Sequence, residues 1–404
     1  MKKKLLIISR FHKLIAKGYS ITLQEIYKTG ILQEKYEIHQ LAWHKTDGDE
    51  LIDGVYVYGV EDLDRLAPSK LKEILGFLKP DIIFLHADPT FFMGYIDVLD
   101  KWKGDIVAWF TIDSERCPSN YKTLFSLFSR VITTSNFGKT VIQKNLNISS
   151  NIVLLGVNHD IFKPMTKDLK LEKKKELGLK ESDVLVLVIG VNILRKAHEL
   201  ALEAFNILLN EHPEIDNLYL YLHTDLNLSM LEFINTNPIL KKKVLYTRNY
   251  DFISSPYPVE KIVDLYNSSD ILFSSSYGEG FGMPFLEAGA CKVLSLAPNN
   301  SSITEVVGDG GVLYPSFGKI PFIDMHGLIN WLRLPDIDSA VKELYELYLN
   351  QDKREVLAEK AYKQSLERTW EKTTLELRNI FDNVLENSSK APEFIYTEPI
   401  LIKV

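Results

Sequence analysis

The chain has 404 residues, 46% of them hydrophobic and 25% charged, which is enough for two domains that each bury a core. Its formal net charge of −7 and isoelectric point near 5.8 give no broad attraction to nucleic acid, so we expect no nucleic-acid partner. The two cysteines, Cys117 and Cys291, lie far apart without metal-ligand spacing, which predicts neither a disulfide framework nor a zinc site.

The apolar segments were compared with the lengths that a signal peptide and a membrane span require. Lys2–Lys4 precede the apolar run Leu5–Ile8 in the manner of a signal peptide, but the run ends at Ser9 and is too short for one. No segment approaches the roughly 18 apolar residues of a membrane span. We therefore expect a cytoplasmic protein without a transmembrane segment, and peripheral membrane contact stays open.

Short apolar runs in the first part of the chain alternate with longer amphipathic segments. Such runs suit strands that are buried on both faces, and the segments between them suit crossover helices, so together they predict a parallel sheet. The runs are 5–8, 82–85, 106–110, 131–133 and 152–155. We expect residues 1–165 to form the first α/β domain, on the acceptor side of the molecule.

A second series of runs begins after the polar, lysine-rich segment 163–180, which indicates a domain boundary. Its members are 184–189, 218–222, 244–246, 271–274 and 293–296. We expect residues 166–365 to form a second such domain, and residues 366–404 to add a helix and an extended tail that pack back on the first. The predicted fold is α/β, with two Rossmann-like, doubly wound parallel sheets facing a cleft and C-terminal helices closing back toward the N-terminal domain.

A glycine-rich loop from Gly278 to Pro284 follows the run 271–274. Glycines let the backbone approach a ligand closely, and Pro284 suits the first turn of a helix. The free amides at a helix start carry on the order of half a positive charge and form an anion site, which a diphosphate fits.

Two carboxylates flank this anion site, Glu279 in the loop and Glu287 in the helix. A carboxylate beside a phosphate is explained if it accepts hydrogen bonds from the hydroxyls of a sugar or a ribose. The alternative is an ordinary strand-to-helix turn at Gly280 and Gly282, with Glu287 complementing the helix dipole. Glycine spacing alone does not separate the two interpretations.

The segment 279–288 resembles the E-x7-E signature of retaining glycosyltransferases of the GT-B fold, specifically the large family 4, also described as glycosyl transferases group 1. Segments 155–164, 222–225, 265–270 and 305–313 also resemble the family. The resemblance implies that Glu287 binds the ribose and that Glu279 binds the hydroxyls of the donor sugar. It also implies that the loop through Gly280 presents the amides of Phe281, Gly282 and Met283 to the sugar and the diphosphate.

The segment 190–196 resembles a family loop whose basic residues hold the donor diphosphate. We assign Arg195 and Lys196 to that role and Asn192 to donor binding, although adjacent cations are also common as a solvated surface pair. Many family members have an arginine where this chain has Val191. This departure leaves Arg195 to supply the missing charge.

The first domain contributes weaker candidates. Gly18 either faces the donor phosphate or is a loop glycine that begins a helix. Asp113 follows the run 106–110, where many family members have a histidine beside the reacting sugar, and either contacts the sugar or acceptor or caps the next segment. His86 and Asp88 follow the run 82–85 and are an acceptor-side pair.

Three Asp-x-Asp triplets resemble the metal motif of another glycosyltransferase fold, at Asp47/Asp49, Asp62/Asp64 and Asp336/Asp338. None follows a predicted buried strand, as that motif requires. We expect no essential metal and no cofactor.

The sequence therefore predicts a retaining hexosyltransferase that moves a sugar from a nucleoside-diphosphate sugar, of UDP or GDP, to a hydroxyl of a glycan, a glycolipid or a protein-linked glycan. Arg195, Lys196 and the helix amides would stabilise the departing diphosphate. Two alternatives stay open: a nucleotide-sugar hydrolase or epimerase on the same fold, and a catalytically silent nucleotide-sugar-binding protein, which Val191 and the absent histidine favour.

Overall fold

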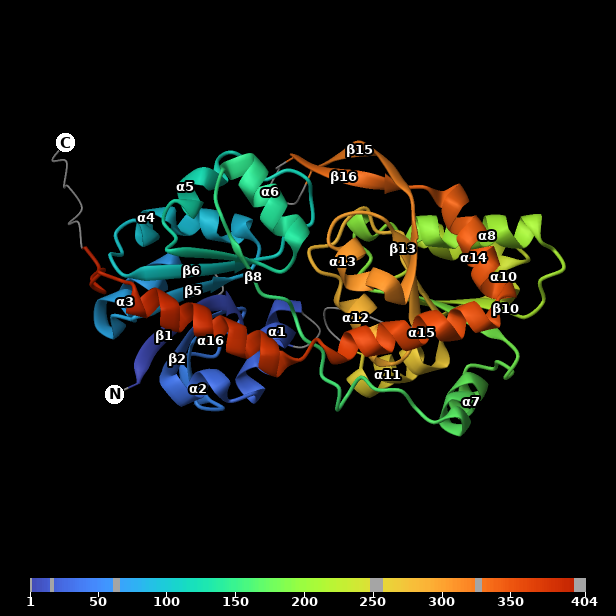
Figure 1. Ribbon diagram of the computed structural model, residues 1–404, viewed down its shortest axis with the longest axis horizontal. Coiled ribbons are helices and arrows are strands. Elements are labelled where there is room, and N and C mark those ends of the chain that lie inside the picture. Colours follow the sequence, from blue (N-terminus) through green and yellow to red (C-terminus); the bar gives the residue numbers. More distant parts are fainter. Residues whose placement is uncertain (1, 15–17, 61–65, 248–256, 324–328, 396–404) are drawn as a thin grey trace.

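The computed structural model describes residues 2–14, 18–60, 66–247, 257–323 and 329–395, which form two α/β domains side by side (Figure 1). The first sheet has the strand order β3-β4-β2-β1-β5-β6-β7-β8 and is parallel except for the β3/β4 pair. Its strands are β1 (Lys3–Arg10), β2 (Tyr36–Trp43), β3 (Glu50–Ile52), β4 (Val55–Tyr58), β5 (Ile82–His86), β6 (Asp105–Phe110), β7 (Arg130–Thr133) and β8 (Asn151–Ile152).

Helices cover both faces of the first sheet, which explains why its central strands are continuous apolar runs. Leu5 to Ile8 of β1 are all fully buried, and they divide alternately between two core clusters on the two faces. The helices are α1 (Gly18–Lys28), α2 (Ile31–Lys35), α3 (Pro68–Leu78), the 3-10 helix η1 (Pro89–Tyr95), α4 (Ile96–Leu99), α5 (Tyr121–Phe125) and α6 (Asn136–Leu146).

The second sheet is entirely parallel, with the order β11-β10-β9-β12-β13-β14. Its strands are β9 (Val184–Ile189), β10 (Leu218–His223), β11 (Val244–Tyr246), β12 (Ile271–Phe273), β13 (Leu294–Pro298) and β14 (Gly311–Tyr314). Its helical segments are α7 (Lys167–Glu176), η2 (Leu194–Lys196), α8 (His198–Glu211), α9 (Leu228–Thr236), α10 (Leu240–Lys243), α11 (Val259–Ser268), α12 (Met283–Ala290), α13 (Ile303–Val307), η3 (Gly308–Gly310), α14 (Ile337–Leu349) and α15 (Gln351–Leu366). The expected α/β fold with two doubly wound parallel sheets is confirmed.

The strand order reverses between β1 and β5 in the first sheet and between β9 and β12 in the second. In open α/β sheets, ligands bind at such reversals, outside the carboxyl ends of the strands. The loops after β7 and β12 meet between the domains, because Thr134 Oγ1 donates a hydrogen bond to the Gly280 carbonyl oxygen at 2.9 Å. The fold thus places the glycine-rich loop against the first domain.

Strand β2 and the β15–β16 hairpin are among the features of the fold that the sequence did not predict. Strand β2 was missed because Glu37, His39 and Gln40 interrupt its apolar run, yet His39 and Gln40 are buried in the sheet. The antiparallel hairpin of β15 (Ser316–Ile323) and β16 (Ile329–Pro335) was missed because its segment contains Gly318 and Pro321, which are disfavoured in strands. Figure 1 shows the hairpin extending from the second domain above the space between the domains.

The last helix, α16 (Trp370–Glu386), runs back over the first domain (Figure 1). Its Trp370, Leu377 and Phe381 lie in the same core cluster as Leu5 and Phe84. Beyond it the tail pairs with the first domain, where the amide of Lys103 donates to Glu393 O at 2.8 Å and that of Ile395 to Lys101 O at 3.0 Å. Among the described residues, no helix is both long and apolar enough to cross a membrane.

The two links between the domains lie side by side. The amide of Val157, on the first link, donates to Arg368 O on the second at 3.1 Å. A Cβ on the neighbouring Gly156 would lie 2.5 Å from the Thr369 carbonyl carbon, closer than atoms pack. The two links can therefore stay in contact only with glycine at position 156.

We predict that Gly156→Ala destabilises the protein by about 1–3 kcal/mol, because the new methyl group forces the two links apart. Urea unfolding followed by circular dichroism measures the loss. Gly94→Ala is the matched control, since a Cβ at position 94 meets nothing within 4 Å. Equal stability of the two variants would contradict the tight contact.

Candidate functional site

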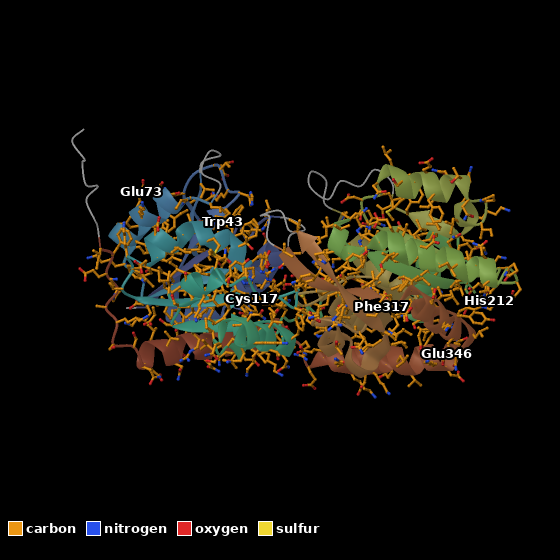
Figure 2. All side chains as sticks on the ribbon, turned by 90° about the horizontal axis from the view of Figure 1, so that it is seen from above. Trp43, Glu73, Cys117, His212, Phe317 and Glu346 are labelled. Atoms are coloured by element: carbon orange, nitrogen blue, oxygen red, sulfur yellow. The ribbon has the colours of Figure 1, made fainter. Side chains whose placement is uncertain are left out.

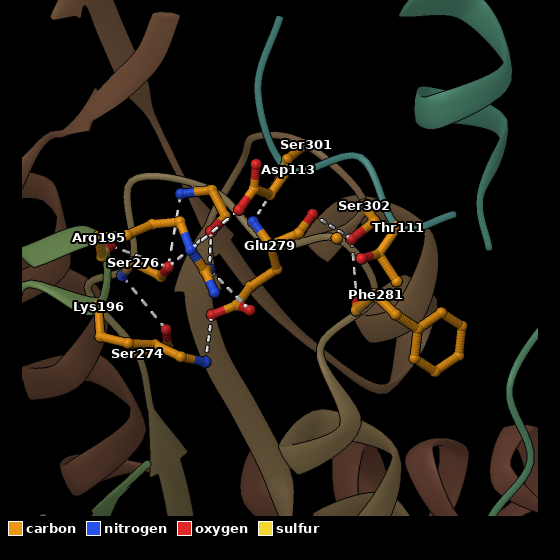
Figure 3. Close-up of polar contacts among 12 residues, drawn as sticks. Thr111, Asp113, Arg195, Lys196, Ser274, Ser276, Glu279, Phe281, Ser301 and Ser302 are labelled. Carbon is orange, nitrogen blue, oxygen red and sulfur yellow. Dashed lines mark hydrogen bonds and ion pairs between the residues drawn. The ribbon is translucent and has the colours of Figure 1, made fainter. Parts of the chain in front are cut away.

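The candidate site lies where η2 and the loop after β12 meet the loop after β6 of the first domain (Figure 3). Glu279 is at its centre and is only 5% exposed. Its Oε1 is 2.5 Å from Lys196 Nζ, and its Oε2 is 2.9 Å from Arg195 Nη1. The sequence prediction put these three residues in one site, and the structure brings them into direct contact.

The charges in this group determine its ionisation. Burial disfavours the charged form of Glu279, but the positive charges of Arg195 and Lys196 outweigh it and lower the pKa of Glu279 to about 2. Burial lowers the pKa of Lys196, while Glu279 opposes that shift. Glu279 therefore stays ionised at neutral pH and is not suited to donate a proton.

Asp113 joins the group from the other domain. Its Oδ2 is 3.1 Å from Arg195 Nε, so Arg195 bridges carboxylates of both domains. Burial raises the pKa of Asp113, with Arg195 opposing the shift and Asp88 adding to it. The structure thus places Asp113 against the cations of the site.

Two glycines of the loop, Gly278 and Gly280, are required by the close approach of the neighbouring domain. A Cβ on Gly280 would lie 2.6 Å from Thr111 Cβ, and one on Gly278 would lie 2.4 Å from the Asp113 carbonyl oxygen. Gly282 has a φ of +99°, a backbone conformation that residues with a side chain rarely adopt. Close approach of the two domains therefore explains two of the three glycines without any ligand.

The amides at the start of α12 are the notable donors of the site. Gly280, Phe281 and Gly282 are buried, and Met283 is half-buried. In the described part of the chain, no protein acceptor takes a hydrogen bond from their four amides. Because buried backbone amides almost always have a partner, four consecutive donors at a helix start form a site for an anion.

Glu287 faces the same region from within α12. Its Oε2 accepts a hydrogen bond from the hydroxyl of Tyr266 at 2.8 Å. Burial raises the pKa of Glu287 to about 7, although the Tyr266 bond and the charge of Lys196 oppose the shift. Tyr266, which the sequence did not single out, thus orients a half-buried carboxylate.

Three other predicted residues, Asn192, Gly18 and His86, make different contacts. The amide group of Asn192 donates to Asp225 O at 2.9 Å, so it ties two loops together. Gly18 is exposed at the start of α1, where a Cβ meets nothing within 4 Å. His86 is 1% exposed and stacks on Trp109, and burial lowers its pKa to about 3.

Asp88 belongs to a hydrogen-bonded group that the sequence did not reveal. Its Oδ1 accepts from Tyr19 Oη at 2.6 Å and from Thr111 Oγ1 at 3.2 Å. Tyr19 follows the candidate Gly18, and Thr111 contacts Gly280 of the other domain. No motif marks a lone tyrosine or threonine, so this group becomes visible only in three dimensions.

The two Asp-x-Asp triplets that the structure describes are separate from this site. Asp47 pairs with Lys45 at 2.6 Å, Asp49 pairs with Lys70 at 3.0 Å, and Asp336 caps α14 through the amide of Ser339. Asp62 and Asp64 lie outside the described residues. Within the described ranges, no three His, Cys, Asp or Glu side chains group closely enough to hold a metal ion.

Comparison with solved structures defines the class of fold. Sucrose-phosphate synthase of Thermosynechococcus elongatus aligns with a TM-score of 0.74 at 12% identity, covering 96% of this chain and 100% of the other. A glycosyltransferase of Rickettsia africae aligns with a TM-score of 0.70 at 17% identity, again over 96% and 100%. HepE of Anabaena, solved with UDP and glucose, aligns with a TM-score of 0.68 at 14% identity over 94% and 100%. The fold is the GT-B fold of glycosyltransferases.

Residues 239–364, which include Glu279 and Glu287, match the family model of glycosyl transferases group 1. The predicted resemblance to glycosyl transferases group 1 is confirmed over that segment. D-inositol 3-phosphate glycosyltransferases of Kribbella flavida and Corynebacterium jeikeium are 26% and 24% identical over 43% and 58% of this chain. The matches span 41% and 51% of those relatives, about half of their length.

The raised pKa of Glu287 predicts a pH-dependent stability. Between pH 4.5, the ordinary value for a glutamate, and about 7, the folded chain keeps a proton on Glu287 that the unfolded chain has lost. Stability therefore falls as pH rises through this window. We predict that Glu287→Gln makes the melting temperature less dependent on pH there and raises it relative to the wild type at pH 8.

Thermal unfolding between pH 4 and 8 measures this effect. Glu260→Gln, at an exposed position of α11, is the matched control. We expect its melting temperature to depend on pH as that of the wild type does. An unchanged pH dependence in Glu287→Gln would show that burial does not raise this pKa.

Proposed function

We propose that the protein is a retaining glycosyltransferase, which moves a hexose from a nucleoside-diphosphate sugar to a hydroxyl acceptor. The observation that carries the proposal is the set of four amides from Gly280 to Met283, without a protein acceptor in the described chain, beside Arg195 and Lys196. Oriented amides together with two cations suit a diphosphate. The match of residues 239–364 to group 1 glycosyltransferases supports the same donor.

The roles of the carboxylates follow from their positions. Glu279, ionised and buried beside the cations, accepts hydrogen bonds from hydroxyls of the donor sugar. Glu287, in the helix behind the loop, accepts from the ribose, and Tyr266 holds it in place. A carboxylate can stay beside a diphosphate because it binds hydroxyl donors while the cations take the phosphate charge.

The chemical step needs no protein base. The bond between the sugar C1 and the leaving phosphate oxygen breaks, and the acceptor oxygen bonds to C1 on the same face. The departing phosphate oxygen takes the acceptor proton. Arg195, Lys196 and the loop amides stabilise the negative charge that grows on the diphosphate, an effect worth several kcal/mol in such sites.

Many family members have an arginine where this chain has Val191. Arg195 supplies the positive charge that this arginine would provide. Its guanidinium reaches Glu279, Asp113 and the Gly278 carbonyl oxygen at once. Asp113 places a carboxylate near the sugar or acceptor. With two cations and four amides for the diphosphate, we propose that the reaction requires no divalent metal or other cofactor.

The nucleotide is UDP or GDP, and the acceptor is a glycan, a glycolipid or a protein-linked glycan. HepE of Anabaena, which shares the fold, has been solved with UDP and with UDP-glucose, which favours UDP. We place the reaction in the cytoplasm or at its membrane surface. A nucleotide-sugar hydrolase or epimerase and a silent binding protein remain the competing functions.

Thermal unfolding with UDP, GDP and ADP tests the donor site. We predict that one nucleotide, at about a hundredfold over its Kd, adds roughly 2.7 kcal/mol to stability. Lys196→Gln abolishes this gain because a charged contact to the diphosphate is lost. Lys122→Gln removes an exposed lysine of α5 and keeps the gain.

Product analysis with the matching nucleotide sugar separates the functions. Transfer with retained anomeric configuration, unaffected by EDTA, supports the proposal. Sugar release to water or epimerised donor in the presence of acceptors favours the hydrolase or epimerase, and donor binding without turnover favours the silent protein. If none of the three nucleotides stabilises the wild type, the proposed function is wrong.

A further inference from the structure

A cavity of about 420 Å³ lies between the two domains beside the candidate site. The first domain lines it from the ends of β1, β5 and β6, with Arg10, Asp88, Phe91, Asp113 and Arg116 among its residues. The second domain lines it with Ile193 and Arg195 near η2, and with Phe322, Asn330 and Leu332 of the β15–β16 hairpin. Since Asp113 and Arg195 line both regions, the cavity adjoins the place where the sugar would react.

The charged side chains that line the cavity are three arginines, Arg10, Arg116 and Arg195, and two aspartates, Asp88 and Asp113. Asp88 accepts from Tyr19 and Thr111, and Asp113 pairs with Arg195, which also pairs with Glu279. Arg10 and Arg116 form no ion pair with any described carboxylate. The guanidinium of Arg10 lies 5.7 Å from the centre of the Phe91 ring, a contact that fixes its position without neutralising it.

Glu115, the neighbour of Arg116 in the chain, forms ion pairs with the β15–β16 hairpin and not with Arg116. Arg333 Nε and Lys319 Nζ are each 2.5 Å from one oxygen of Glu115. The Glu115 amide donates to Trp331 O at 3.0 Å, so backbone contact accompanies the ion pairs. The hairpin is thereby held against the first domain as one wall of the cavity, and Arg116 is left with its full charge.

We propose that this cavity binds an acceptor that carries an anionic group, a phosphate or a carboxylate on a sugar or polyol, which Arg10 and Arg116 hold beneath the hairpin. Arginine is suited to this role because its planar group donates two parallel hydrogen bonds to such an anion. Phe91 and Phe322 offer apolar surfaces for the carbon skeleton of the acceptor. The inference rests on the proposed glycosyl transfer, since it names the substrate class of the acceptor side.

Calorimetric titration of the full-length protein, saturated with the nucleotide that stabilises it, tests this inference. The probes are glucose 6-phosphate, inositol 1-phosphate and glucuronate, each against its neutral counterpart glucose or inositol. Vesicles of phosphatidylcholine with and without phosphatidylinositol distinguish a lipid-borne phosphate from a free one. We expect at least one anionic probe to bind at least tenfold more tightly than its neutral counterpart.

Arg116→Gln and Arg10→Gln should each weaken that anionic probe about tenfold or more, since each removes a charged hydrogen bond. Neither change affects nucleotide stabilisation. Arg130→Gln, an exposed position of β7, is the matched control for loss of one charge from the same domain and keeps the preference.

Equal binding of anionic and neutral probes, or a preference that survives both substitutions, overturns the inference while nucleotide binding remains intact. Absence of nucleotide binding instead overturns the proposed function itself. The two failures are therefore distinguishable in one set of proteins.

Discussion

The burial of Glu279 between Arg195 and Lys196 is the interaction on which the rest of the site depends. A carboxylate that is 5% exposed stays ionised only because two cations lie within 2.9 Å of its oxygens. Arg195 extends the same group to Asp113 of the first domain. The position of the glycine-rich loop, the position of η2 and the approach of the two domains are thus coupled through one set of charges.

The close approach of the two domains also leaves no room for side chains at two positions of the glycine-rich loop. Side chains at positions 278 and 280 would collide with Asp113 and Thr111, while Phe281 inserts into an apolar cluster of the first domain. Glu305 strengthens the contact by accepting the amides of Asn136 and Phe137 at the start of α6, at 2.8 and 2.6 Å. The loop that offers its amides to an anion is therefore also a principal contact between the domains.

The sequence predicted the sheets and the centre of the site because both leave strong local signals. Buried parallel strands are apolar runs, and Glu279, Glu287, Arg195 and Lys196 follow strands at positions that resemble a known motif. Tyr19, Thr111 and Tyr266 leave no such signal, because their roles arise from partners 21 to 92 residues away in the chain. The hairpin was hidden by Gly318 and Pro321, which suit an isolated two-stranded sheet but not a central strand.

The position of α16 has a consequence for how the protein is made. Trp370, Leu377 and Phe381 cover apolar residues of the first sheet, including Leu5 and Phe84, although nearly the whole second domain separates them in the chain. During synthesis the first domain emerges hundreds of residues before the helix that covers this face. Its apolar surface stays exposed until α16 has been synthesised, so the nascent chain depends on chaperone protection or on late assembly of the first domain.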